Sequence, residues 1–262
     1  METVTHHGRA TAYRVTDEGG DGPPICFVHG SGGTGETWVG QRDLADRYPV
    51  VTMDLSGHGD SDDVDAEPGA EALEAYVEDV CAVLEATGAR VVVGFSLGGA
   101  VALQVLLERD VDLEAAVLTS TGAKLAVLPD LLEWLAEDFD RALEFVHDPG
   151  RLFVDPDAEG CEAARAEMTD TGRAVTRRDF VTCDRFDVRG RLAEIDVPVL
   201  ALAGEEDQLT PPAYHEYLVE EVDDARLETI PDGAHMVMRE HPEAFNDAVA
   251  AFLADVTGDD EQ

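Results

Sequence analysis

The chain has 262 residues, with 57 Asp and Glu against 18 Lys and Arg, which gives a formal net charge of −39. A negative excess of this size repels nucleic acids and anionic membranes, so we expect neither as a partner. No apolar run could span a bilayer, and the first residues lack the basic and apolar segments of a secretory signal. We therefore expect a cytoplasmic protein, monomeric or homodimeric, whose partner is a small molecule.

The acidic residues are spread along the whole chain, and Lys124 is its single lysine. Repulsion among so many like charges destabilises a compact state unless ions screen it. The screening length falls to about 3 Å at 1 M salt, so concentrated salt weakens this repulsion strongly. The composition therefore predicts a halophilic protein that loses stability at low ionic strength.

The chain begins with a predicted antiparallel hairpin, Thr3–Thr5 and Arg9–Thr16, around His6-His7-Gly8. Short apolar strands then alternate with helices. The further expected strands are Ile25–His29, Val50–Met53, Arg90–Gly94, Ala115–Ser120, Val197–Ala203 and Arg226–Ile230. The expected helices are Glu71–Thr87, Leu97–Arg109, Pro212–Val219 and Pro242–Val256. Such alternation is typical of an α/β fold with a mostly parallel sheet covered by helices on both faces.

A glycine-rich loop, residues 30–35, follows the predicted strand Ile25–His29. Glycines let the backbone approach a substrate and turn its amides inward, as an oxyanion hole requires. We expect one donor to be the amide of Ser31, with Gly32 as the alternative, and the ring of His29 to brace the loop. The loop lacks the context of a dinucleotide site, in which G-x-G-x-x-G leads into a helix and a ribose-binding acid lies downstream, so no cofactor is expected.

The segment Gly94-Phe95-Ser96-Leu97-Gly98 lies between a predicted strand and a predicted helix. This is the context of a nucleophile elbow, in which a serine in a strained turn exposes its hydroxyl above the sheet. The flanking glycines allow the strand and the helix to approach closely. We therefore predict Ser96 as a nucleophile and the amide of Leu97 as the second oxyanion donor.

Residues 121–189 interrupt the alternation of strands and helices, with expected helices at Pro129–Glu144 and Ala158–Thr169. We interpret this segment as a helical cap inserted into a core domain made of residues 1–120 and 190–262. Caps select substrates and exclude water. Packing against the sheet is the alternative role for the aromatic residues near the site. The candidate substrate-pocket residues are Trp38, Trp134 and Phe139.

A carboxylate that orients the base is expected at the end of the strand Val197–Ala203, on the same sheet edge as Ser96. Three acids compete there: Glu205, Glu206 and Asp207. Asp207 is favoured because the prolines that follow restrict its loop and because its short side chain suits a fixed contact. The two glutamates remain the alternatives.

His235, in the loop after the last predicted strand, is the candidate general base. Its place in the chain gives the order Ser, Asp, His that this arrangement shows in α/β proteins. We expect the histidines of the N-terminal turn to be solvated. Surface positions are expected for three further histidines, His147, His215 and His241.

Taken jointly, these motifs resemble the α/β-hydrolase superfamily from about residue 10 to residue 256. The matching segments are His29-Gly30 with its loop, residues 54–61, the elbow at Ser96, Gly204 to Asp207, and Gly233-Ala234-His235. The resemblance implies a nucleophile at Ser96, an acid at Asp207 and a base at His235. It also implies that residues 57–59 form a structural loop, so that His58 has no catalytic role.

The sequence thus predicts a serine hydrolase that cleaves a small ester, thioester or lactone through an acyl-enzyme. Two alternatives stay open. The segment 183–189 resembles relatives that hydrolyse C–C bonds or enol-lactones, and some members of the superfamily keep the triad as small-molecule receptors or signalling partners. The four cysteines have no zinc spacing and no calcium-loop motif is present, so no metal is expected.

Overall fold

The computed structural model describes residues 1–155 and 160–258. Eight strands form one sheet in the order β1-β2-β4-β3-β5-β6-β7-β8. The neighbours β1–β2 and β2–β4 are antiparallel, and all others are parallel. The strands are β1 (Glu2–His6), β2 (Arg9–Thr16), β3 (Ile25–Val28), β4 (Val50–Met53), β5 (Val91–Phe95), β6 (Ala115–Thr119), β7 (Val199–Gly204) and β8 (Ala225–Ile230). The predicted α/β fold with a mostly parallel sheet is confirmed.

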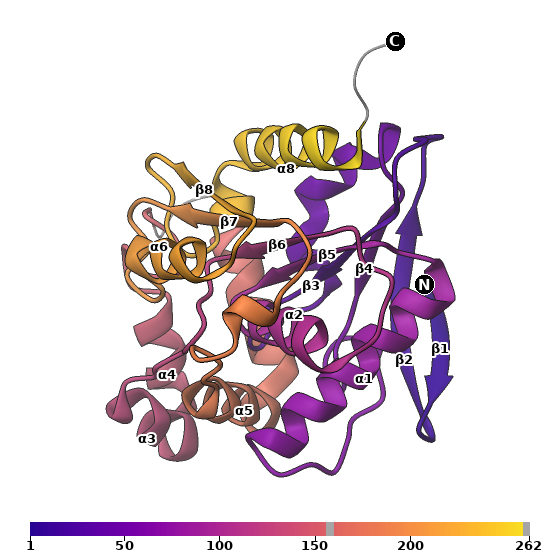
Figure 1. Ribbon diagram of the computed structural model, residues 1–262. Helices are drawn as coiled ribbons and strands as arrows, with labels where there is room; N and C mark the ends of the chain where they lie inside the picture. Colours follow the sequence, from indigo (N-terminus) through magenta and orange to yellow (C-terminus); the bar gives the residue numbers. More distant parts are fainter. Residues whose placement is uncertain (156–159, 259–262) are drawn as a thin grey trace.

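Helices cover both faces of the sheet (Figure 1). Successive strand residues point to opposite faces, so Cys26 and Val28 pack with α1 and α2, whereas Ile25 and Phe27 pack with the 3-10 segment η1 and with α8. The helical elements of the core are η1 (Gly35–Asp46), α1 (Ala70–Thr87), α2 (Leu97–Glu108), η2 (Leu192–Glu194), α6 (Pro212–Glu221), α7 (Val237–Glu240) and α8 (Pro242–Thr257). In the described part of the chain, no helix is long and apolar enough to cross a bilayer.

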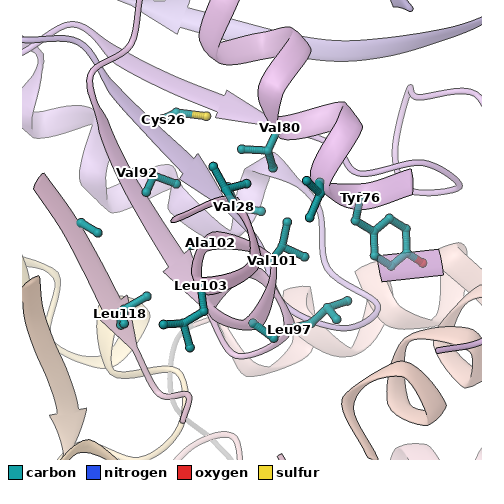
Figure 2. Close-up of a cluster of buried hydrophobic side chains, with 14 of the residues drawn as sticks. Cys26, Val28, Tyr76, Val80, Val92, Leu97, Val101, Ala102, Leu103 and Leu118 are labelled. Carbon is teal, nitrogen blue, oxygen red and sulfur yellow. The ribbon is translucent and has the colours of Figure 1, made fainter. Parts of the chain in front are cut away.

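The apolar layer between the sheet and α1 and α2 is shown in Figure 2. Val92 and Leu118 reach into it from two neighbouring strands, Val80 comes from α1, and Leu97 and Val101 come from α2. All five side chains are fully buried. Burial of a Val or Leu side chain stabilises a fold by about 1.5–3 kcal/mol, so this layer fixes α2 firmly on the sheet. The start of α2 is therefore a rigid position for a functional group.

Residues 121–189 contribute three helices beside the sheet: α3 (Pro129–Glu137), α4 (Phe139–Val146) and α5 (Cys161–Arg185). The two ends of this segment pair with each other, since Val188 N donates to Ala123 O at 2.8 Å and Lys124 lies opposite Asp187. The chain thus leaves the core and returns to it at one point.

Two of the expected helices differ clearly from the structure. The expected helix Pro129–Glu144 is two helices, because Asp138 caps a new start and accepts a hydrogen bond from Arg141 N. The helix expected at Ala158–Thr169 continues to Arg185 as α5, with a break at Gly172, where φ is 80°. Ala158 itself lies outside the described residues. The 3-10 segment η1 was not expected, because its polar residues show little helical periodicity.

Candidate active site

Ser96 lies between β5 and α2 with φ 52° and ψ −112°, a conformation that residues other than glycine rarely adopt. A Cβ atom on Gly94 would lie 2.4 Å from the Gly98 carbonyl oxygen, and one on Gly98 would lie 2.3 Å from the Val28 carbonyl oxygen. Only glycine fits at either position. The strand, the turn and the helix therefore have the geometry expected of a nucleophile elbow.

The elbow is also held from the side of β6. Ser96 N donates to Thr119 O at 3.1 Å, and the Thr121 hydroxyl donates to Ser96 O at 2.8 Å. Thr121 N in turn donates to the Nε2 atom of His215 at 3.1 Å. Because its backbone is fixed at both its amide and its carbonyl, Ser96 has a defined position above the sheet.

His235 and Asp207 form a buried pair on the loops that follow β8 and β7. His235 Nδ1 donates to Asp207 Oδ2 at 2.9 Å, and the imidazole packs on the ring of Phe95 with centroids 4.9 Å apart. Both side chains are buried. With Nδ1 engaged in this way, Nε2 is the ring nitrogen that remains to exchange a proton.

Within the described part of the chain, Asp207 accepts four hydrogen bonds. Its Oδ1 receives the amides of Leu209 and Thr210 at 2.8 and 2.9 Å, and its Oδ2 receives the Thr210 hydroxyl at 2.8 Å as well as His235. Burial alone would raise the pKa of this carboxyl, but the adjacent His235 and these donors outweigh burial, so the pKa is lowered. Asp207 is therefore ionised and can stabilise an imidazolium. Glu205 and Glu206, the two alternatives, are exposed.

The His235 loop is in contact with two other segments. A Cβ atom on Gly204 would lie 2.3 Å from the Gly233 carbonyl oxygen, so glycine at the end of β7 allows the loop to pass close by. His235 N donates to Arg151 O at 3.1 Å, and Met236 N donates to Leu152 O at 2.8 Å. The segment between α4 and α5 thus contacts the backbone of the histidine itself.

The glycine-rich loop brings its amides next to the elbow. Gly32 N donates to Asp179 Oδ2 at 3.0 Å, so this amide already has a partner and does not suit an oxyanion. Within the described part of the chain, the amides of Ser31 and Leu97 make no such bond. Leu97 is the first residue of α2, where an amide has no partner in its own helix. The pair Ser31 and Leu97 is therefore favoured over the alternative Gly32.

Asp179 of α5 is the centre of a buried polar network that sequence reasoning missed. Besides Gly32 N, its carboxylate accepts His58 Nε2 at 2.9 Å and the Tyr76 hydroxyl at 2.6 Å. Burial opposes both charges, but each stabilises the other, so the pKa of His58 is raised and that of Asp179 is lowered. A buried ion pair thus holds the glycine-rich loop.

Ser96 and His235 line one cavity of about 350 Å³. Larger cavities of about 430 and 850 Å³ contain neither residue. No Arg or Lys lines the Ser96 cavity among the described residues. Its lining is mainly apolar, and much of it comes from residues 121–189: Leu125, Ala126, Val127, Leu128, Leu131, Phe145, Leu152, Met168, Phe180 and Cys183.

Comparison with known proteins places this geometry in a family. The sequence profile described as the Alpha/beta hydrolase family matches residues 27–248, which span the glycine-rich loop, the elbow and the His235 loop. The chain belongs to this family.

Relatives of this alpha/beta hydrolase include several esterases. A solved structure described as a thermophilic esterase is 32% identical, covers 97% of each chain and superposes with a TM-score of 0.84. The pimeloyl-[acyl-carrier protein] methyl ester esterase of Neisseria meningitidis serogroup C is 29% identical over 252 residues, which cover 84% of this chain and 90% of that protein. A third relative, the 2-hydroxy-6-oxo-6-(2'-aminophenyl)hexa-2,4-dienoic acid hydrolase of Metapseudomonas resinovorans, is 28% identical over 256 residues, 92% of this chain and 88% of that protein.

The three aromatic residues expected in the substrate pocket of this alpha/beta hydrolase do not line the Ser96 cavity. Trp38 is fully buried in the core, with its ring centroid 5.0 Å from that of Phe27. Trp134 and Phe139 are half-buried on α3 and α4. Residues six positions apart on a helix point about 120° apart, so Phe139 lies on a different side of α4 from Phe145, which lines the cavity.

Two histidines expected at the surface are buried instead. His215 is fully buried behind the elbow, and burial lowers its pKa to about 4, so the neutral ring accepts the amide of Thr121. His147 is buried and bonds through Nδ1 to Leu143 O at 2.7 Å. His29 braces the glycine-rich loop as expected, with its ring between Gly30 O and Leu55 N. The sequence does not indicate the hydrogen bond between His215 and Thr121, because the two residues are 94 positions apart.

Proposed function

We propose that this alpha/beta hydrolase is a serine hydrolase that cleaves a small, uncharged ester, thioester or lactone through an acyl-enzyme. One observation carries the proposal. Ser96 is held at positive φ on the elbow, and it lines the same cavity as an imidazole whose Nδ1 is bound by an ionised, buried carboxylate. This arrangement can activate a hydroxyl that is otherwise a weak nucleophile.

In the proposed mechanism, His235 Nε2 takes the proton of Ser96 as the hydroxyl attacks the carbonyl carbon. Asp207 keeps the imidazole in one orientation and stabilises its charged form. The amides of Ser31 and Leu97 donate to the oxyanion of the tetrahedral intermediate. His235 then protonates the leaving group, and water activated by the same imidazole releases the acyl group from Ser96. Residues 121–189 act as the cap that encloses the substrate.

The cavity favours an uncharged substrate. Its lining is mainly aliphatic and aromatic, and no cationic side chain reaches it among the described residues. A substrate carboxylate enclosed there would lose its hydration without gaining a partner, which is costly. The Metapseudomonas relative is named for a dienoic acid, so C–C hydrolysis of such an acid remains the second candidate. It is disfavoured because no Arg or Lys among the described residues lines the cavity to pair with the acid.

Turnover of p-nitrophenyl esters of rising acyl length, in molar KCl, tests the proposal. We expect activity on neutral acyl chains with an optimum length set by the cavity, and weak activity on matched chains that end in a carboxylate. Ser96→Ala should lower kcat by several orders of magnitude. Preference for the carboxylate-ended chains would contradict the proposed substrate class, and full activity in Ser96→Ala would contradict the nucleophile.

A further inference from the structure

The β1–β2 hairpin places two consecutive imidazoles beside helix α1. His6 Nδ1 lies 3.3 Å from His7 Nδ1, and His7 Nδ1 lies 3.5 Å from Glu78 Oε2. In the described part of the chain, this is the one group of His, Cys, Asp and Glu side chains whose three ligand atoms all lie within 4.8 Å of one another. Three potential ligands therefore converge at a point that the proposed hydrolysis does not use.

We propose that His6, His7 and Glu78 bind a divalent transition-metal ion of the zinc class. Zinc bonds of about 2.0–2.1 Å in tetrahedral geometry separate neighbouring ligand atoms by roughly 3.3 Å, close to the 3.3 and 3.5 Å observed between these atoms. Two imidazole nitrogens and one carboxylate oxygen suit such an ion. Softer ions prefer sulfur ligands, and harder ions such as Mg²⁺ and Ca²⁺ prefer oxygen ligands alone. The side chain of His7 is exposed, so a water molecule can complete the coordination.

The groups around the cluster orient these ligands. His6 Nε2 lies 2.7 Å from the Thr11 hydroxyl and 3.2 Å from Asp79 Oδ1. When His6 is protonated on Nε2, this N–H can donate to the Thr11 hydroxyl and to Asp79 Oδ1. The lone pair on Nδ1 is then available to bind the ion. Histidine ligands of metals characteristically donate a hydrogen bond from their other ring N–H to a carboxylate in this way.

The two carboxylates are also held in place. Asp79 is fully buried and accepts the Ser56 amide at 2.8 Å, and Arg9 donates to Glu78 Oε2 at 2.9 Å. Ligating carboxylates are themselves commonly hydrogen-bonded, so the Arg9 contact fixes Glu78, and Oε2 keeps a second lone pair for the ion. The chain's net charge of −39 attracts cations to the whole surface. The contacts that orient His6 and Glu78 distinguish this position from the other acidic positions.

An ion bound here would join the edge hairpin β1–β2 to α1. The hairpin lies at the end of the sheet, and β4 and β3 separate it from β5, the strand that precedes Ser96. Binding therefore stabilises the fold by mass action, because the unfolded chain does not hold the three ligands together. A binding measurement and a melting temperature both report on the site without depending on hydrolysis.

Calorimetric titration of the chelator-treated full-length protein with ZnCl2, in molar KCl with excess MgCl2, tests the proposal. We expect one Zn²⁺ per chain and a rise in melting temperature. His7→Asn should weaken binding by at least about tenfold, and Asn tolerates the left-handed backbone of residue 7, so the turn is kept. Glu78→Gln should weaken it as well. The matched control Glu74→Gln removes an exposed glutamate from the same helix and should bind as wild type does.

Three results would overturn the proposal. One is equal Zn²⁺ affinity in wild type and His7→Asn. Another is weak binding at many sites that MgCl2 abolishes, which would indicate screening of surface carboxylates. The third is a tight site that survives His7→Asn and disappears in His235→Ala, which would place the ion at the catalytic histidine. A titration with Co²⁺, whose visible absorption reports tetrahedral coordination, should show the same dependence on His7.

Discussion

At the residue scale, the environment of Asp207 separates it from its acidic neighbours. Glu205 and Glu206 are exposed, whereas Asp207 is buried and accepts hydrogen bonds from two amides, a hydroxyl and His235. The short Asp side chain keeps the carboxylate close to its own loop. Its role in the proposed mechanism is to hold one tautomer of the imidazole, which a neutral amide cannot do reliably.

Asp207→Asn should leave the loop folded and lower kcat by roughly 10³–10⁴-fold, because the imidazole loses its preferred tautomer and its stabilising charge. KM for the best p-nitrophenyl ester should change much less. Steady-state kinetics of the purified variant measures both values.

Glu206→Gln is the matched control, since it removes a negative charge one residue away without touching His235. Its kcat should equal that of wild type. If Glu206→Gln lost activity and Asp207→Asn kept it, the orienting carboxylate would be assigned to the wrong residue.

At the element scale, helix α5 joins the segment 121–189 to the glycine-rich loop. Asp179 on this helix binds the Gly32 amide and the ring of His58, and the neighbouring Arg178 donates to Ser56 O at 3.0 Å. Because Gly32 follows Ser31 directly, a shift of α5 moves the amide that is proposed to stabilise the oxyanion. We therefore expect the position of the helix to affect the rate of the proposed reaction.

Asp179→Asn should lower kcat on the order of 10- to 100-fold with little change in KM, because it loosens the loop without removing an oxyanion donor, a loss that costs roughly 10²–10³-fold. Asp170→Asn, an exposed position on the same helix, should behave as wild type. A variant of Asp179 that raised KM alone, with kcat intact, would contradict the coupling.

The His58–Asp179 pair also predicts a pH dependence of stability. The raised pKa of His58 means that its contribution is full below about pH 6.5 and is lost as pH rises through the raised value. The lowered pKa of Asp179 means that its contribution is full above about pH 4 and is lost as pH falls through the lowered value.

The difference in melting temperature between wild type and Asp179→Asn should therefore be largest between about pH 4 and 6.5. It should narrow on either side of that window. Thermal melts of both proteins across this range measure the difference, and a difference that grew steadily above pH 8 would contradict the charged pair.

The sequence predicted the strands and the positions of Ser96, Asp207 and His235, because the ends of parallel strands meet at one edge of the sheet. It could not predict the partner of Gly32, since Asp179 is 147 residues away and is one of 57 acidic residues. Trp38 follows the glycine-rich loop, so the sequence leaves both a packing role and a pocket role open for it. Its burial is decided by contacts with Phe27 and Phe245, which only the folded chain brings together.

At the scale of the whole molecule, negative charge dominates the surface. The 57 acidic residues outnumber the 18 basic ones, so the basic side chains are too few to neutralise the carboxylates. Pairs do form where a basic residue is present, for example between Arg226 and Asp255 at 2.6 Å. Exposed pairs of this kind contribute only about 0–1 kcal/mol each, so they do not offset the repulsion.

The melting temperature should therefore rise from dilute buffer to molar KCl, because ions screen the repulsion among carboxylates. Scanning calorimetry measures the change. Sucrose at equal osmolality is the control, since it strengthens burial without screening charge. A melting temperature that stayed level or fell in KCl would contradict the expected salt dependence.

The most direct test of the central claim is covalent labelling of the full-length protein by a fluorophosphonate, read by intact mass in molar KCl. The proposed mechanism predicts one adduct per chain, carried by Ser96 and absent in Ser96→Ala, with slow labelling in Asp207→Asn. No adduct in the folded wild-type protein, or an equal adduct in Ser96→Ala, would contradict an activated serine at the elbow.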